Sequence, residues 1–440
     1  MKNNAILFCF IAIWFASCAD NKPAAEIPAI DIEANLFNME EISLDILSDK
    51  IEYIKLENSG DILTLNMRSS FVCNDSLMLI TDLGKCLLYK KNGEFFGKIG
   101  EKGRGPGEYH SVINARFGPE GTIFLQNLYD LMIYNIDGTF VEKRKNIFYV
   151  DENVIASWEI IRDSLIFGKI SSSTGNADYK ALLYDIKSDK VIRGYNNYIK
   201  FDRPVAVSSF DERHSNIIEY NDKIYFKEFY NDTLFVMTDE LEMVPIYNID
   251  LGEYKSPLSN RQVMPNEADF GKTATVLNVY ITDKYLLLDC GYGEMFPAKR
   301  INPEVFSVIG MDNSTITVNR EFNTAFGLGL YDIKTGELVF SEPTSTDNRL
   351  FTSGLYNNID GGPRFYPNAM IGDTAMVMWV DVKDLKDHVA SDDFKNAVVK
   401  YPEKKQKLLE LADSLDELDN PVLILVTLNE CNGLKSLGGD

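Results

Sequence analysis

One short unit recurs six times along the chain, and this repeat limits the possible folds more than any other feature. Each unit holds a turn residue, a run of strand-forming residues such as DSLMLITD, a short gap and a second run such as CLLYKKNGEF. Several second runs close in Asn-Gly, Asp-Gly or a similar dipeptide, which is typical of a β-hairpin. A strand pair with one apolar face cannot bury that face alone, so the units must pack on one another. The six units begin at Asp75, Gly121, Asp163, Asp222, Asp283 and Asp373.

The spacing of these units predicts an all-β fold, a six-bladed β-propeller. The unit starts lie 46, 42, 59, 61 and 90 residues apart, and a four-stranded blade takes about 40–50 residues. The longer intervals predict insertions, the largest in residues 291–325. Residues 51–57, IEYIKLE, lie before the first unit, and we expect them to pair with the C-terminal run PVLILVTLN. That pairing completes the last blade and closes the ring, so that only short strand edges stay exposed.

A helical insertion is predicted inside the last blade, at residues 383–419. This stretch is rich in charge and contains no glycine. Pro402 stands where a second helix can begin, because proline is tolerated in the first turn. Two interpretations remain open: the helical stretch packs on the rim of the ring, or it binds a partner. Leucines recur there at helical spacing and predict one apolar stripe, made of Leu408, Leu411, Leu415 and Leu418.

The first residues predict an export signal. Residues 5–17, AILFCFIAIWFAS, are uncharged but too few to span a bilayer, which needs roughly 20. They fit the apolar core of a secretory signal. The core ends at Ser17-Cys18, and a polar segment with two prolines follows. The predicted organisation has three parts: a signal peptide at 1–17, a tether at 18–40 and one propeller at 41–440.

A small residue followed by cysteine at the end of such a core resembles the lipobox of bacterial lipoproteins. In that class the cysteine becomes the lipidated first residue after cleavage, so the resemblance implies a lipid anchor on Cys18. Phe15 stands where this class usually has leucine. The alternative is an ordinary secretory signal that is cut elsewhere. The resemblance implies an outer-membrane lipoprotein of the cell envelope, which faces the periplasm or the cell surface.

The charge balance argues against a nucleic-acid partner. The chain has 44 Lys and Arg against 66 Asp and Glu, a formal charge of −22, which repels phosphate backbones. The three histidines, at positions 110, 214 and 388, are too few for a His-rich metal site or a proton relay. Their scarcity favours binding over catalysis. The cysteines beyond the signal are either buried thiols or disulfide partners; they are Cys73, Cys86, Cys290 and Cys431.

The most specific motif is a glycine-rich loop in KNGEFFGKIGEKGRGPGEYHSV, residues 91–112. Its glycines alternate as G-x-G-x-G, a proline interrupts them and a strand follows, so a phosphate site at a helix N-terminus is not expected. Glycines permit the positive φ that a crossing between blades requires. We expect Tyr109 to pack between blades, and Arg104 and Glu108 either to form an internal ion pair or to face the channel mouth. His110 follows directly and is predicted to be a surface or packed residue.

This loop resembles the NHL-type propeller repeat, and the whole chain is similar to a family of six-bladed β-propeller lipoproteins from gut-type Gram-negative bacteria. The resemblance implies the fold and the compartment, and it implies no activity. The full glycine loop is present once here, whereas the other blade junctions have diverged. The matching pieces are Cys18, IEYIKLE at 51–57, the GRGPGEY loop, NIDGGPRFYP at 358–367 and DNPVLILVTL at 419–428.

A second candidate lies in NNIDGGPRFYPNAM, residues 357–370, which is predicted to be a loop. Aromatic side chains beside Arg or Asp suit contacts to sugars and peptides, and loops at a propeller face are where ligands usually meet the fold. A turn that joins two blades needs the same glycines and proline, so both interpretations remain open. Together the two loops supply the candidate ligand-face residues Arg104, Glu108, Tyr109, His110, Asp360, Arg364 and Tyr366.

These patterns favour a binding or scaffold module for a protein, peptide or glycan in the cell envelope, with no catalytic residue, metal ligand or cofactor assigned. The alternative is a Ca²⁺-dependent hydrolase or lyase with its site at the central channel, because six-bladed propellers include Ca²⁺-dependent lactonases. The sequence contains no D-x-D-x-D-G loop for Ca²⁺ and no G-x-S-x-G motif. Carboxylates and amides from different blades that meet on the axis would favour the enzyme, and an apolar axis would exclude it.

Overall fold

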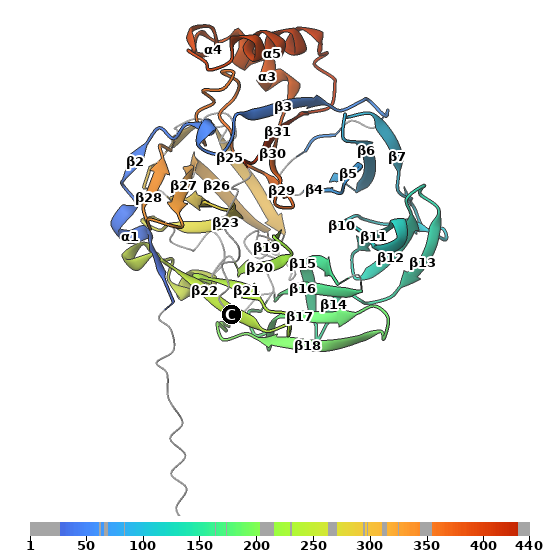
Figure 1. Ribbon diagram of the computed structural model, residues 1–440. Coiled ribbons are helices and arrows are strands. Elements are labelled where there is room, and N and C mark those ends of the chain that lie inside the picture. Colours follow the sequence, from blue (N-terminus) through green and yellow to red (C-terminus); the bar gives the residue numbers. More distant parts are fainter. Residues whose placement is uncertain are drawn as a thin grey trace, which may run out of the picture.

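The computed structural model of the chain is a six-bladed β-propeller, seen along its axis in Figure 1. The first strands of neighbouring blades contact one another around the axis. This confirms the fold expected from the repeat. The structure describes residues 27–429 except 61–62, 66–68, 83, 163, 173, 203–214, 229–230, 263–270, 294, 297, 310–314, 324 and 344–353.

Each blade is an antiparallel sheet whose four main strands run in chain order from the axis to the rim, the last blade excepted. Blade 6 takes its outermost strand from the N-terminal part of the chain. From the innermost strand outwards, blade 1 contains β4 (Ser70–Cys73), β5 (Leu77–Asp82), β6 (Lys85–Lys90) and β7 (Phe95–Lys98), and blade 2 contains β10 (Ala115–Phe117), β11 (Thr122–Asn127), β12 (Asp130–Asn135) and β13 (Phe140–Arg144). Blade 3 contains β15 (Asn153–Ile161), β16 (Leu165–Ser171), β17 (Tyr179–Asp185) and β18 (Lys190–Asn196), and blade 4 contains β19 (Ser215–Tyr220), β20 (Lys223–Glu228), β21 (Thr233–Met237) and β22 (Met243–Asp250). Blade 5 contains β23 (Thr275–Ile281), β24 (Tyr285–Gly291), β27 (Phe326–Asp332) and β28 (Leu338–Ser341), and blade 6 contains β29 (Ala369–Ile371), β30 (Ala375–Val380), β31 (Val422–Thr427) and β3 (Lys50–Lys55).

The repeat in the sequence corresponds to the second and third strands of each blade. Every residue of β5 and of β30 is buried, because a propeller blade is covered on both faces by its neighbours. Strands buried on both faces appear in a sequence as continuous apolar runs. The outermost strand β13, in contrast, alternates between half-buried and exposed residues. Of the six predicted unit starts, Asp163 lies outside the described residues.

Buried polar side chains of the second strands tie neighbouring blades together. In blade 2 the Gln126 amide donates to the carbonyl oxygen of Ile155 in blade 3, at 2.9 Å. In blade 4 the Lys227 ammonium donates to the carbonyl oxygen of Val276 in blade 5, at 2.7 Å. These bonds satisfy main-chain carbonyls of the innermost strands and fix how the blades are set against each other.

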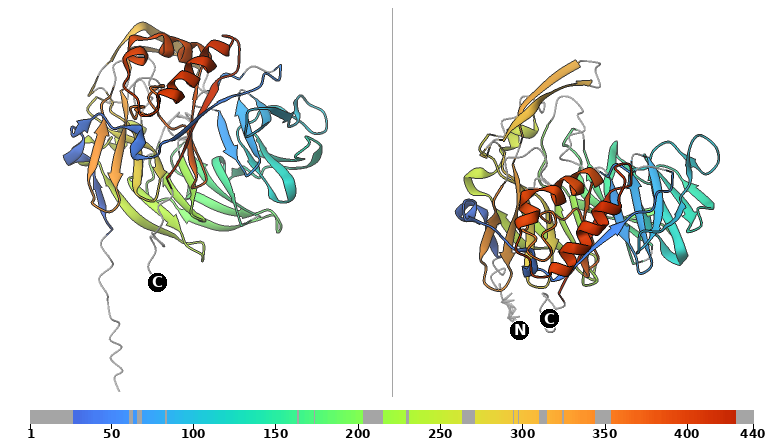
Figure 2. Two further views of the ribbon diagram at one scale, coloured as in Figure 1. Left: turned by 45° about the horizontal axis from the view of Figure 1, so that its top comes forward. Right: turned by 90° about the horizontal axis from the view of Figure 1, so that it is seen from above.

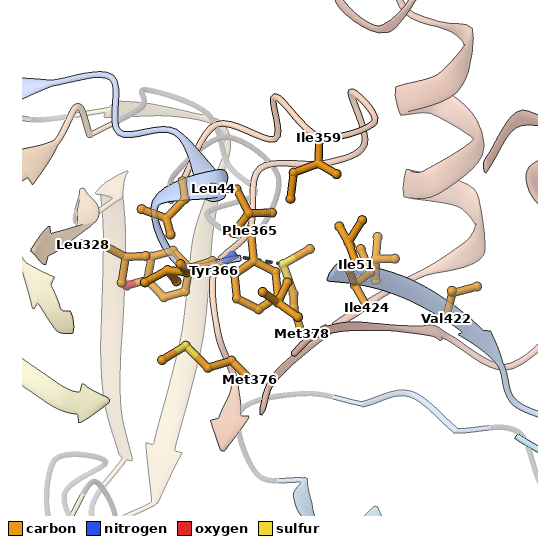
Figure 3. Close-up of a cluster of buried hydrophobic side chains, with 14 of the residues drawn as sticks. Leu44, Ile51, Leu328, Ile359, Phe365, Tyr366, Met376, Met378, Val422 and Ile424 are labelled. Atoms are coloured by element: carbon orange, nitrogen blue, oxygen red, sulfur yellow. Dashed lines mark hydrogen bonds between the residues drawn. The ribbon is translucent and has the colours of Figure 1, made fainter. Parts of the chain in front are cut away.

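The ring closes as expected from IEYIKLE. β3 pairs antiparallel with β31, and Ile54 stands opposite Leu423. β31 also pairs with β30, so the last blade joins both ends of the propeller. Figure 3 shows Ile51 of β3 and Ile424 of β31 together in the buried cluster beside the helical insertion.

The predicted tether is shorter than residues 18–40. β1 (Ala29–Asp31) pairs parallel with β22, and β2 (Met39–Glu40) pairs parallel with β28. Between them lies the short helix α1 (Ile32–Asn35). Ile30 and Ile32 are fully buried in a hydrophobic cluster at the rim of blades 4 and 5. Three apolar residues scattered in a polar segment, Ile30, Ile32 and Leu36, were too weak a signal to predict this packing.

The helical insertion lies between β30 and β31, and it packs on the rim of the ring, which is the first of the two interpretations. Pro402 is the first residue of its longest helix, as predicted. The predicted leucine stripe is partly wrong. That helix ends at Ser414, Ala412 takes a buried position, and Leu418 beyond the end is 71% exposed. The helices are α3 (Val382–Ala390), α4 (Asp392–Asn396) and α5 (Pro402–Ser414).

The other expected insertion contains a long hairpin that rises from the ring (Figure 2).

None of the described helices is long and apolar enough to cross a membrane. Cys73, Cys86 and Cys290 are free thiols, and burial raises the pKa of the latter two, whereas Cys431 lies outside the described residues. The remaining elements are the hairpin strands β25 (Ala298–Ile309) and β26 (Thr315–Asn323), the short strands β8 (Glu101–Lys102), β9 (Glu108–Tyr109) and β14 (Tyr149–Val150), and the 3₁₀ helices η1 (Leu44–Ile46), η2 (Pro119–Gly121), η4 (Gly252–Tyr254) and η5 (Leu258–Arg261).

The two faces of the ring differ in their connections. Within a blade, first-to-second and third-to-fourth strand turns lie on one face, because consecutive strands run in opposite directions. These turns contain two to five residues, and we call this side the short-turn face. Connections between blades, and from second to third strands, lie on the other side, the long-loop face. Both large insertions, at 292–325 and 381–421, start and end on the long-loop face, although the helices of the second pack on the rim and Lys400 reaches Asp49 at the short-turn end of β3.

Candidate functional site

The glycine-rich loop joins blade 1 to blade 2 on the long-loop face. Gly100 and Gly107 adopt φ values of +63° and +76°, which glycine tolerates without strain. Tyr109 is fully buried in the cluster between blades 1 and 2, as expected. The Glu108 carboxylate accepts the Gly105 N–H at 2.6 Å. The loop is therefore built chiefly as a junction between blades.

The polar residues of this loop face solvent. Arg104, Glu108 and His110 are exposed, and within the described part of the chain Glu108 makes no ion pair with Arg104. Asn127, at the end of β11, accepts the main-chain N–H groups of His110 and Ser111 at 3.1 and 3.2 Å. His110 is thus a surface residue whose backbone is fixed from the neighbouring strand.

Asp360 lies in a different place, buried under the helical insertion with an exposed fraction of 1%. Its Oδ1 accepts three hydrogen bonds, from Tyr53 Oη at 3.0 Å, Asn357 Nδ2 at 2.7 Å and the Gly362 N–H at 2.9 Å. Its Oδ2 is buried and has no hydrogen-bond partner among the described residues. Desolvation by burial raises the pKa of the Asp360 carboxyl, although these three donors act against that shift.

We expect the replacement Asp360→Asn to change how stability depends on pH. A carboxyl whose pKa is higher in the folded protein destabilises the fold progressively as pH rises through that pKa. The stability of the wild type relative to Asp360→Asn should therefore fall between pH 4 and pH 8, as measured by urea unfolding.

Asp49 supplies the control for this prediction. A hydrogen bond from Lys400 lowers the pKa of the exposed Asp49 carboxyl, which is the opposite direction. Relative to Asp49→Asn, the wild type should lose stability only as pH falls below about 4, the ordinary range of an aspartate. If the difference in unfolding free energy between Asp360→Asn and the wild type stayed constant from pH 4 to 8, the Asp360 carboxyl would not be titrating as its burial requires.

The other two candidate residues of segment 357–370, Arg364 and Tyr366, also hold the fold together. The Arg364 guanidinium pairs with Glu41 at 2.7 Å and lies over the Tyr356 ring, 5.3 Å from its centroid. Tyr366 is buried, and its hydroxyl donates to Asp289 of blade 5. The segment therefore joins blade 5 to blade 6 and supports the helical insertion.

The seven predicted residues do not form one site. Arg104, Glu108 and His110 are exposed at the junction of blades 1 and 2, whereas Asp360 and Tyr366 are buried in the cluster below the helices. The other described histidine, His388, donates from Nε2 to the Gly361 carbonyl oxygen at 2.8 Å, and desolvation lowers its pKa. His214 lies outside the described residues.

Carboxylates from three blades approach the axis at the short-turn face. Glu159 on β15 binds Arg116 of blade 2 through two contacts of 2.6 Å. Glu219 on β19 is open to solvent, yet its pKa is raised, first by desolvation and then by the negative charges of Glu159, Asp222 and Asp373. Within the described residues no three His, Cys, Asp or Glu side chains are arranged to hold a metal ion. The axis is therefore acidic, and in this part of the chain it has no formed metal centre.

The sequence reasoning missed an exposed aromatic pair on the long-loop face, Tyr129 and Tyr149. Their ring centroids lie 4.8 Å apart with the planes inclined at 46°. Tyr129 follows Leu128, which has a positive φ of +53°. The available signal was the turn NLYD, which places two large apolar residues between strands where Asn-Gly or Asp-Gly is usual.

Comparisons with known proteins agree with the fold. The model of a family described as a domain of unknown function, DUF4934, matches residues 27–427. A Bacteroides fragilis protein described as exported superposes with a TM-score of 0.58 at 17% identity, over 89% of this chain and 99% of its own. A Bacteroides vulgatus member of the DUF4221 family superposes with a TM-score of 0.42 at 14% identity, over 67% of this chain and 93% of its own. Virginiamycin B lyase from Staphylococcus aureus superposes with a TM-score of 0.34 at 10% identity, over 68% of this chain and 89% of its own. No curated protein matches the chain.

Proposed function

Because the chain belongs to the DUF4934 family, whose description assigns no activity, we propose from its own geometry that it is a lipid-anchored binding module of the cell envelope. In this proposal Cys18 carries the lipid, and the propeller presents its long-loop face to a partner protein or peptide. The similarity to an exported Bacteroides protein supports the compartment only by analogy of fold.

The observation that carries the proposal is the unequal elaboration of the two faces. No turn of the short-turn face exceeds five residues, whereas the connections that start and end on the long-loop face include the 34 residues of 292–325 and the 41 residues of 381–421, whose helices extend onto the rim. Long connections above a rigid scaffold are where binding residues are concentrated. A module that needed only a stable ring would not require them.

The direction of the N-terminal strand supports an orientation. β1 runs parallel to β22, and β22 runs from the short-turn face towards the long-loop face. The chain therefore approaches Ala29, which pairs with Asn248 near the long-loop end of β22, from the side of the short-turn face. A lipid on Cys18, eleven residues earlier in the sequence, would place the short-turn face nearest the membrane. The long-loop face would then point away from the membrane, where a partner can reach it.

Site-specific photocrosslinking in intact cells tests this proposal. A photoreactive residue is placed at two exposed positions of the long-loop face, Ile113 and Leu258, and at two exposed controls on the short-turn face, Asp75 and Asp222. We expect a discrete protein adduct from the first pair and none from the second. The replacement Cys18→Ala should move the protein from the membrane fraction to the soluble fraction. Adducts from the short-turn positions alone would contradict the proposal.

The second candidate function, a Ca²⁺-dependent hydrolase or lyase, is favoured by one observation, the acidic axis. Three other carboxylates, from blades 3, 4 and 6, lie within electrostatic reach of Glu219; they belong to Glu159, Asp222 and Asp373. Ligand binding to the folded state raises the melting temperature. A melting temperature that rises with Ca²⁺ in the wild type and not in Glu219→Gln would favour this candidate, and turnover of a lactone would establish it over the binding module.

A further inference from the structure

A small apolar surface is exposed on the long-loop face between blades 2 and 3. It consists of Leu128, Tyr129 and Tyr149, and we call it the tyrosine patch. The side chains are exposed by 48%, 42% and 41%, although large apolar residues gain most from burial. The two rings are in contact, so the exposed area is continuous. Ile113, also exposed, lies next to it because its N–H donates to the carbonyl oxygen of Gln126.

The first part of the patch is held in a strained conformation by buried contacts. Leu128 has φ +53°, which is costly for a branched side chain. The fully buried Gln126 amide donates to the Leu128 carbonyl oxygen at 3.0 Å, and the Phe148 N–H donates to the Tyr129 carbonyl oxygen at 2.9 Å. The strain therefore fixes two apolar side chains in solvent, which does not help the fold.

The second part of the patch stands on a rigid hairpin. Tyr149 and Val154 are paired across β14 and β15, and the turn between these strands has only two residues, Asp151 and Glu152. Both turn residues have positive φ, +47° and +64°, where Asn-Gly is usual. Two strained turns thus converge to hold one aromatic surface, and rigid surfaces of this kind bind with little loss of conformational entropy.

The charge around the patch indicates the chemistry of its occupant. The segments that carry it, residues 126–130 and 145–153, contain Asp130, Asp151 and Glu152 against Lys145 alone. Asp130 is paired with Lys143 at 2.6 Å, whereas Asp151 and Glu152 are exposed at the hairpin tip beside Tyr149. The chain as a whole carries −22. Aromatic faces bordered by carboxylates attract ammonium and guanidinium groups by cation–π and ionic contacts.

We propose that the tyrosine patch binds a basic segment of a partner protein, whose Lys or Arg side chains stack on Tyr129 and Tyr149 while a neighbouring apolar side chain covers Leu128. This inference rests on the proposed binding function and names its ligand class. The rings serve as central anchors, and the hairpin carboxylates steer the cationic segment towards them.

A peptide-binding measurement tests the proposal. The probe is a labelled decapeptide that alternates Lys and Phe, and the comparison probes are its Glu–Phe counterpart and neutral maltohexaose. We expect the wild type to bind the Lys–Phe peptide, with an affinity that falls as salt rises. The double variant Tyr129→Ala/Tyr149→Ala should bind it at least tenfold more weakly. The variant Asp151→Asn/Glu152→Gln should weaken binding mainly at low salt.

Tyr198→Ala is the matched control, because Tyr198 is 85% exposed in another connection of the same face. It should bind the peptide as the wild type does. Unchanged affinity in the double variant, or tighter binding of maltohexaose than of the Lys–Phe peptide, would overturn the proposal. If the alanine variant has a lowered melting temperature, Tyr129→Lys/Tyr149→Lys is tested in its place. This variant keeps long side chains but repels the cationic peptide, so it should also lose binding.

Photocrosslinking in cells separates this inference from the function on which it rests. If the double variant still gives the Ile113 and Leu258 adducts at the wild-type level, the binding module stands and the tyrosine patch is not its contact. If neither protein gives an adduct, the binding module itself fails.

Discussion

Replacing Leu423 by proline should open the propeller ring and abolish its cooperative unfolding. Leu423 is fully buried in β31, where it stands opposite Ile54 of β3 on one side and Trp379 of β30 on the other. Proline removes a main-chain donor and does not fit a central strand. Because β31 is the strand that joins the two ends of the ring, the loss is not confined to one blade. We expect at least about 3 kcal/mol less stability, measured by urea unfolding.

Val141→Pro is the control for this prediction. Val141 is exposed in β13, the outermost strand of blade 2, at a position where the register with β12 shifts. Proline is tolerated at edges and bulges, so this variant should unfold within about 0.5 kcal/mol of the wild type. A Leu423→Pro protein that kept a wild-type midpoint and slope would show that the β3–β31 pairing does not close the ring.

The second large effect is expected from Trp158→Ala. Trp158 is fully buried at the junction of blades 2 and 3, where its ring centroid lies 5.1 Å from that of Phe148. Its Nε1 donates to Gln126 Oε1 at 2.8 Å, and the Arg116 guanidinium lies 5.6 Å from its ring centroid. Removing a buried Trp side chain costs about 3–5 kcal/mol. The variant should also loosen Gln126 and, through it, the turn that holds Tyr129.

Trp158→Phe separates packing from hydrogen bonding. Phenylalanine keeps most of the aromatic volume and removes only the Nε1 donor, so we expect a loss of about 1–3 kcal/mol, the cost of a buried acceptor left without its partner. Chemical unfolding of both variants at one pH provides the comparison. Equal losses for Ala and Phe would show that the contact with Gln126, and not the packing of the ring, makes Trp158 important.

The fold was predictable because a propeller blade leaves a local signature. Second strands such as β5 and β30 are buried on both faces and therefore appear as unbroken apolar runs. The closing strand was predictable for a different reason, since IEYIKLE has strand-forming residues and no partner in its own neighbourhood. The packed residues 29–40 were not predicted, because the burial of Ile30, Ile32 and Leu36 depends on apolar side chains that blades 4 and 5 contribute.

The candidate site was less predictable, because side-chain roles depend on contacts between distant parts of the chain. Tyr109 was correctly placed between blades from a local glycine pattern. Asp360 was assigned to a ligand face, but it is buried under the helical insertion, and one of its three donors, Tyr53, is 307 residues away in the sequence. Tyr129 and Tyr149 gave no motif, since each is an ordinary turn or strand residue until two strained turns bring their rings together.

The sequence by itself determined the number of blades, the strand that closes the ring and the position of the insertions, because each depends on hydrophobic patterns within about ten residues. Tertiary structure alone decided which polar and aromatic side chains are buried ties between blades and which face solvent. The physical reason is that the burial of one side chain depends on neighbours contributed by other blades. It also decided that the acidic axis and the tyrosine patch lie on opposite faces, because strand direction, not composition, assigns each turn to its face.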